Sequence, residues 1–116
     1  MKMIVWNCQG AGNVAFRNPA YELHHKHRPQ ILIIVEPRIV EERAQAVIDT
    51  LLYTHSRIVD PTSFYGGIWM LWNESNALKV EILTNSEYNI HALVKEPHGA
   101  GVGGSYPTSI SWQQLA

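Results

Sequence analysis

The sequence predicts an α/β domain over residues 1–95, and two observations carry this prediction. The first is Ile31–Val35, five uninterrupted aliphatic residues, which is typical of a central strand buried on both faces. The second is the order strand, helix, strand between Met3 and Val35, which predicts a βαβ unit with parallel neighbouring strands. A chain of 116 residues is long enough for one domain with a modest core.

The first half of the chain alternates between strand and helix patterns. Met3–Trp6 is a short apolar strand that ends at Asn7, and a turn rich in Gly and Asn follows it. Asn18 is expected to cap a helix that begins at Pro19 and continues to about His27. Pro29 ends this helix, because proline cannot continue the helical hydrogen bonds.

A second helix is predicted from about Val40 to Tyr53. Its apolar residues recur at helical spacing and form one stripe, which consists of Ala44, Val47, Ile48, Leu51 and Leu52. A short strand is expected at Arg57–Asp60. Ile68–Trp72 is apolar throughout and is therefore predicted to be another central strand.

The later strands follow one another without a helix between them. Lys79–Thr84 and Tyr88–Lys95 are joined by a short polar link, so we expect them to pair antiparallel. Apolar and polar residues alternate in Tyr88–Lys95, which indicates a half-buried strand. Residues 96–116 are predicted to be an irregular Gly-rich tail, because their glycines lack the lysine and the flanking elements of a phosphate loop.

Composition and charge exclude several classes of protein. Hydrophobic residues make up 46% of the chain and the formal net charge is −1, so no overall basic field attracts nucleic acid. Cys8 is the only cysteine, which rules out an intrachain disulfide. The sequence has neither an apolar run that could span a bilayer nor the pattern of a signal peptide, and we expect an intracellular chain without a membrane partner.

Glu36 is the first candidate functional residue. It stands at the carboxyl end of the Ile31–Val35 strand, where open α/β sheets place their ligand crevices. A carboxylate at this position needs a cation, hydrogen-bond donors or water. Glu36 is therefore either part of a metal or phosphate site or a strand-end charge turned to solvent.

Three motifs, in order, resemble a known family. They are Ile4-Val5-Trp6-Asn7-Cys8-Gln9-Gly10, then His27-Arg28-Pro29 leading into Ile31–Val35 and Glu36-Pro37-Arg38, and then Gly66-Gly67-Ile68-Trp69-Met70-Leu71-Trp72. Together they look like the endonuclease/exonuclease/phosphatase superfamily, and most closely like endonuclease domains of plant LINE-type (non-LTR) retrotransposons. The resemblance covers roughly Met3 to Val94, the first half of such a domain. It implies a truncated, partial DNase-like α/β sandwich: a mixed sheet with two helices, and one layer of strands exposed or missing.

The resemblance implies a role for two residues of this chain. Asn7 would lie beside the scissile phosphate and the metal, and Glu36 would be a direct ligand of Mg²⁺. Magnesium prefers carboxylate oxygens and neutralises the charge that develops on a phosphate. An amide can orient a phosphate or a carboxylate without adding charge. Asn7 also has a simpler interpretation, as a turn residue whose side chain bonds its own backbone.

The sequence also departs from the family. Gln9 stands where some relatives carry a second acid, and the later Tyr-bearing strand, Gly-Asp-Phe-Asn-type motif and Ser-Asp-His-type motif are missing. The expected function is therefore a fragment of a Mg²⁺-dependent endonuclease domain, which acts on DNA in the intact family and is inactive as this chain. The alternative is a non-catalytic retrotransposon-derived remnant or interaction protein. Self-association through an exposed sheet surface is expected in either case.

Histidine and tryptophan residues offer weaker candidates. His24 and His27 are three apart on a predicted helix, but a stable zinc site needs three or four ligands, and a solvated helix end is the simpler interpretation. Trp69 and Trp72 lie in an apolar strand, so we predict core positions rather than platforms for stacking bases.

Overall fold

Two β-sheets and two α-helices make up the structure, a computed structural model that describes residues 2–12, 14–63, 65–75, 78–86, 89–97 and 105–113. The first sheet contains β1 (Met3–Asn7), β2 (Ile31–Val35), β3 (His55–Val59) and β4 (Ile68–Trp72), in the order β1-β2-β4-β3. The second sheet contains β5 (Lys79–Asn85), β6 (Asn89–Pro97) and β7 (Ser105–Gln113), in chain order. The helical segments are η1 (Val14–Phe16, a 3₁₀ turn), α1 (Arg17–His27) and α2 (Glu41–Ile48).

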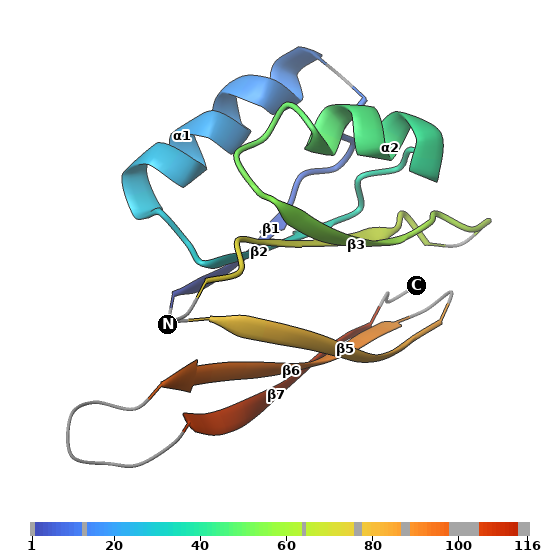
Figure 1. Ribbon diagram of the computed structural model, residues 1–116. Coiled ribbons are helices and arrows are strands. Elements are labelled where there is room, and N and C mark those ends of the chain that lie inside the picture. The colour runs from blue at the N-terminus through green and yellow to red at the C-terminus, as the bar shows by residue number, and fades with distance from the viewer. Residues whose placement is uncertain are drawn as a thin grey trace.

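The strands and helices are stacked in three layers. Helices α1 and α2 cover one face of the first sheet, and the second sheet lies against its other face (Figure 1). Strand β1 pairs with β2 in parallel, whereas β4 pairs antiparallel with both β2 and β3. The prediction of an α/β domain with a mixed sheet and two helices is confirmed, as is the parallel pairing of the first two strands.

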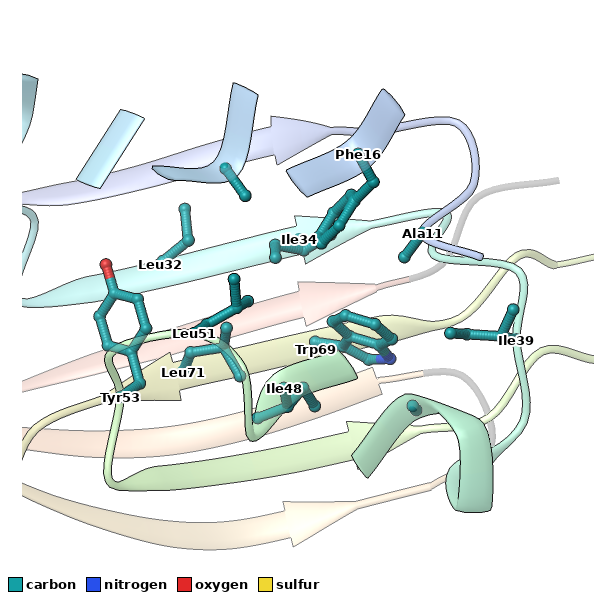
Figure 2. Close-up of a cluster of buried hydrophobic side chains, with 12 residues drawn as sticks. Ala11, Phe16, Leu32, Ile34, Ile39, Ile48, Leu51, Tyr53, Trp69 and Leu71 are labelled. Carbon is teal, nitrogen blue, oxygen red and sulfur yellow. The ribbon is translucent and has the colours of Figure 1, made fainter. Parts of the chain in front are cut away.

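The helix-side cluster, buried between the helices and the first sheet, forms one half of the core. Leu32 and Ile34 of β2 and Trp69 of β4 are each at most 1% exposed within it. Figure 2 shows Ile48 of α2 near Trp69 and Leu71 of β4, and Phe16 beside Ile34. The ring of Phe16 also contacts Trp69 edge-on, with a centroid distance of 6.1 Å. This packing confirms Trp69 as a core residue.

The inter-sheet cluster forms the other half of the core. It joins Ile31 and Ile33 of β2 to Ile90, Ala92 and Val94 of β6, all of which are at most 1% exposed. The alternation in β6 therefore directs one face of that strand onto the first sheet, as the sequence pattern predicted. Strand β2 contributes to both clusters, because successive side chains of a strand point to opposite faces.

Two sequence predictions about the sheets are wrong. Residues 96–116 were expected to be an irregular tail, but Ser105–Gln113 forms β7 and pairs antiparallel with β6 along its whole length. A layer of strands was expected to be exposed or missing, but β5, β6 and β7 cover one face of the first sheet. The glycines at 99, 101, 103 and 104, on which the tail prediction depended, lie outside the described residues.

Both helices differ in detail from their predictions. Asn18 does not cap α1, because η1 leads directly into the helix and Asn18 lies inside it. Helix α2 is shorter than predicted, and Leu52 follows it with 54% of its surface exposed, outside the expected apolar stripe. Ala44, Ile48 and Leu51 of that stripe are buried. Within the described part of the chain, neither helix has the length and apolar character needed to cross a membrane.

A pair of leucine substitutions tests the packing of the two sheets. Leu78 precedes β5 and is 2% exposed in the inter-sheet cluster, whereas Leu83 of β5 is 44% exposed. Leu78→Ala is expected to lower the free energy of unfolding by about 2–5 kcal/mol, because it leaves a cavity between the sheets. Leu83→Ala should change it by less than about 0.5 kcal/mol. Urea denaturation followed by circular dichroism measures both, and equal small losses would show that the sheets do not pack on each other.

Candidate functional site

The carboxyl ends of β1 and β2 bring the two predicted site residues together. Asn7, the last residue of β1, is in register with Val35, the last residue of β2, and Glu36 follows directly. Asn7 and Glu36 both line one cavity of about 270 Å³. The expectation that they lie near each other at one edge of the sheet is confirmed. Their role in binding a metal or a phosphate stays a prediction.

The cavity lies between the two sheets and has mostly apolar walls. Val5 and Val35 line it from β1 and β2, and Ile68 lines it from β4. Trp112 and Gln113 of β7 also line it. These last two residues were not predicted as site residues, because residues 96–116 were expected to be an irregular tail. The alternation of Ser109, Ile110, Ser111 and Trp112 is the signal that could have predicted a strand there.

The backbone of Glu36 is held in an unusual conformation. Its φ is 58°, in the left-handed region that residues other than glycine rarely adopt. Its N–H donates to the carbonyl oxygen of Gly67 at 3.1 Å, and its own carbonyl oxygen accepts from the N–H of Gly10 at 2.9 Å. These bonds connect the end of β2 to the turns that follow β1 and precede β4. The direction in which the Glu36 side chain leaves the sheet is therefore fixed by its neighbours.

Gly66 packs directly on Glu36. A Cβ atom at residue 66 would lie 2.9 Å from the Cα of Glu36, closer than real Cβ contacts allow. Any other residue at position 66 would push Glu36 away from its present place. The Gly-Gly sequence before β4, which contributed to the family resemblance, thus has a physical role beside the candidate site.

Arg38 forms an ion pair with Glu36. Nη2 of Arg38 lies 3.4 Å from Oε2 of Glu36, and the side chains are 56% and 38% exposed, respectively. Arg38 has a φ of 62°, and its N–H donates to the carbonyl oxygen of Gly66 at 2.7 Å. The sequence analysis quoted Arg38 as part of a motif but assigned it no role. A pair two residues apart at a strand end has no periodic signature that would have revealed it.

The side chain of Asn7 stabilises the turn after β1. Its Oδ1 accepts a hydrogen bond from the backbone N–H of Gln9 at 3.2 Å. Gln9 has a φ of 54°, and a bond from an asparagine side chain to the backbone two residues on is the pattern of an Asx turn. The turn interpretation of Asn7 therefore has direct support. A role at the cavity is compatible with it, because an amide oxygen has a second lone pair and the amide nitrogen has two donors.

Cys8 follows Asn7 in the chain and forms a hydrogen bond with the backbone of Glu36. Its thiol donates to the carbonyl oxygen of Glu36 with a sulfur–oxygen distance of 3.6 Å. Burial raises the pKa of the Cys8 thiol above its usual value. The thiol therefore stays protonated at neutral pH and serves as a weak donor rather than a nucleophile.

The other candidates from the sequence lie away from this cavity. His24 packs beside Tyr53, and its Nδ1 lies 3.3 Å from the Tyr53 hydroxyl. Burial lowers the pKa of His24 and raises that of Tyr53 to about 12, so both groups are neutral at pH 7. Trp69 and Trp72 are 0% and 5% exposed, which confirms the prediction of core positions.

The donors at the site suit a weakly held hard cation. Among the residues that the structure describes, no group of three or more His, Cys, Asp or Glu side chains lies close enough to hold a metal ion. Glu36 offers a carboxylate and Asn7 an amide oxygen at the same cavity. Magnesium keeps several waters and accepts as few as one or two protein carboxylates, so these donors fit a largely hydrated Mg²⁺.

Comparison with known proteins leaves the family unassigned. No protein-family model matches the chain, and no curated protein is significantly similar to it. The fold and the site therefore define an α/β domain with two sheets and a strand-end cavity.

Gly66→Ala tests how the loop before β4 positions Glu36. The added methyl group must displace the Glu36 backbone, and the free energy of unfolding is expected to fall by about 1–3 kcal/mol. The backbone amide signals of Glu36 and Gly10 should shift in an NMR spectrum. Ser63→Ala, at an exposed position of the same loop, is the control and should leave both unchanged. Unshifted Glu36 signals in Gly66→Ala would contradict this close packing.

Proposed function

We propose that this chain carries part of a DNase-like phosphodiesterase domain, in which Asn7 and Glu36 form a weak site for Mg²⁺ and phosphate. The observation that carries the proposal is that these two residues line one cavity, at the carboxyl ends of parallel strands. The arrangement of two helices on one face of a mixed sheet, with a second sheet on the other, is compatible with such a domain (Figure 1). Ligands of open α/β sheets bind at this edge.

Glu36 and Asn7 have different roles at the proposed site. Glu36 supplies a negatively charged oxygen ligand, and Asn7 supplies an amide that orients a phosphate oxygen or a bound water. When bound, Mg²⁺ would neutralise charge on the phosphate. Val5, Val35 and Ile68 form apolar walls beside these polar groups.

We further propose that the chain does not hydrolyse DNA by itself. Hydrolysis needs a water that a general base positions and deprotonates, in addition to charge neutralisation. Among the described residues that line the cavity, Glu36 is the only one that ionises. A carboxylate that binds the metal ion cannot also act as the free base, so the site lacks an independent proton acceptor.

The second candidate function is a non-catalytic interaction protein that associates with itself. Strand β1 is an edge strand of the first sheet, and Met3 and Val5 are 36% and 41% exposed. Ile4 and Trp6 point into the helix-side cluster, so Met3 and Val5 lie on the opposite face. An apolar edge strand without an inward charge or a proline is a template for pairing with a second copy.

Plasmid nicking tests the enzymatic part of the proposal. The purified chain with Mg²⁺ is expected to nick supercoiled DNA at the same background rate as Glu36→Ala at equal purity. Because any contaminating nuclease acts equally in both preparations, the comparison isolates the contribution of this site. Nicking by the wild type that disappears in Glu36→Ala would show that the two residues suffice for catalysis, and the proposal of inactivity would be wrong.

Sedimentation velocity tests the self-association. Met3→Lys places a charge on the exposed edge and is expected to shift the chain toward the monomer, because a lysine at a strand edge opposes pairing. Leu52→Lys adds the same charge at a residue that is 54% exposed on the helix side, and it should leave the distribution unchanged. A wild-type chain that is monomeric at all concentrations would exclude this second function.

A further inference from the structure

The loop after β2 places a cation beside Glu36, which carries the only carboxylate among the described residues that line the cavity. Glu36 and Arg38 both have left-handed backbone angles, with φ values of 58° and 62°, on either side of Pro37. This double bend turns Arg38 back toward Glu36, and Nη2 of Arg38 lies 3.4 Å from Oε2 of Glu36. The approach of the guanidinium is thus a consequence of the backbone path.

Four backbone hydrogen bonds hold that path. Glu36 and Arg38 donate to the carbonyl oxygens of Gly67 and Gly66 at 3.1 and 2.7 Å. The carbonyl oxygens of Glu36 and Pro37 accept from the N–H groups of Gly10 and Ala11 at 2.9 and 2.8 Å. The segment is therefore tied on both sides, to the turn after β1 and to the loop before β4. Its left-handed residues are supported by these neighbours.

We propose that Arg38 is a built-in counter-cation that suppresses the binding of divalent ions at Glu36. This inference rests on the proposed function, because it concerns the same carboxylate. The guanidinium occupies one side of the Glu36 carboxylate, and its charge repels any second cation that approaches the same oxygens. Exposed ion pairs add little to stability, but the repulsion acts on a dication with twice the force that it exerts on a monovalent ion.

The inference makes Arg38 a specificity-determining residue of the site. A carboxylate with its own guanidinium is locally neutral and prefers a ligand that carries both charges, such as a phosphate together with its metal ion. Arginine can bind phosphate oxygens through its planar fork, which would draw it away from Glu36. Free divalent ions then bind only weakly until an anion engages Arg38.

Binding of Mn²⁺ measures the effect without an activity assay. Manganese shares the preference of Mg²⁺ for carboxylate and water ligands, and its paramagnetism broadens NMR signals close to the bound ion even at a weak site. The wild type is expected to show weak broadening around Glu36 and Asn7. Arg38→Gln should bind Mn²⁺ about tenfold more tightly, because it removes the neighbouring positive charge.

Three further variants separate charge from structure. Arg38→Lys retains the charge and should bind Mn²⁺ as weakly as the wild type. Arg28→Gln makes the same change at the other end of β2, at a residue that also has a left-handed φ of 44°, and should have no effect. Adding Glu36→Gln to Arg38→Gln should abolish the gain in Mn²⁺ affinity. This result would show that the ion binds at the Glu36 carboxylate. Signal dispersion in the same spectra reports whether each variant is folded.

The outcomes distinguish this inference from the proposed function. Suppose that Arg38→Gln binds Mn²⁺ no more tightly than the wild type, and that adding Glu36→Gln weakens Mn²⁺ binding in both proteins. The proposed cation site at Glu36 is then supported, and the proposed role of Arg38 is wrong. An equal gain in Mn²⁺ affinity in Arg28→Gln would also overturn the proposed role of Arg38, because the gain would then result from the change in net charge. If no folded variant shows binding that depends on Glu36, both the inference and the proposed cation site fail.

Discussion

Burial of β2 on both of its faces is the constraint on which the rest of the structure depends. Leu32 and Ile34 point into the helix-side cluster, and Ile31 and Ile33 point into the inter-sheet cluster, all with at most 1% of their surface exposed. Each such side chain contributes about 1.5–3 kcal/mol by leaving water. Because β2 also pairs with β1 and β4, its position aligns the ends of three strands. The cavity exists at the place where this buried strand reaches the edge of the core.

The end of β2 shows how the fold determines the site. A left-handed conformation at a residue other than glycine costs about 1–3 kcal/mol, and Glu36 and Arg38 both adopt it. Backbone hydrogen bonds from the neighbouring turns offset that cost. Gly66 leaves room for the Glu36 backbone, because it has no side chain. The left-handed conformation of these two residues is therefore maintained only when β1, β2 and β4 are correctly assembled. A core substitution that moves any of these strands is therefore expected to displace Glu36 as well.

The sequence predicted the parts of the fold that local patterns encode. Uninterrupted apolar runs located β2 and β4 with their observed bounds, and the βαβ spacing predicted the parallel pairing that brings Asn7 close to Glu36. Strand β7 was missed because the glycines before it outweighed the alternation within it. The exposure of Leu52 was missed because it depends on where α2 ends, which helical spacing does not specify.

The least predictable feature was the local charge of the site. The sequence predicted either a metal or phosphate ligand or a solvated charge at Glu36, but Arg38 of the same loop lies within ion-pair distance of it. That contact depends on two left-handed residues whose conformation comes from hydrogen bonds to distant turns, so residue spacing alone cannot reveal it. The positive charge of Arg38 repels any other cation that approaches the same carboxylate. The surroundings of Glu36 therefore depend on how the loop after β2 folds as well as on the strand that places it.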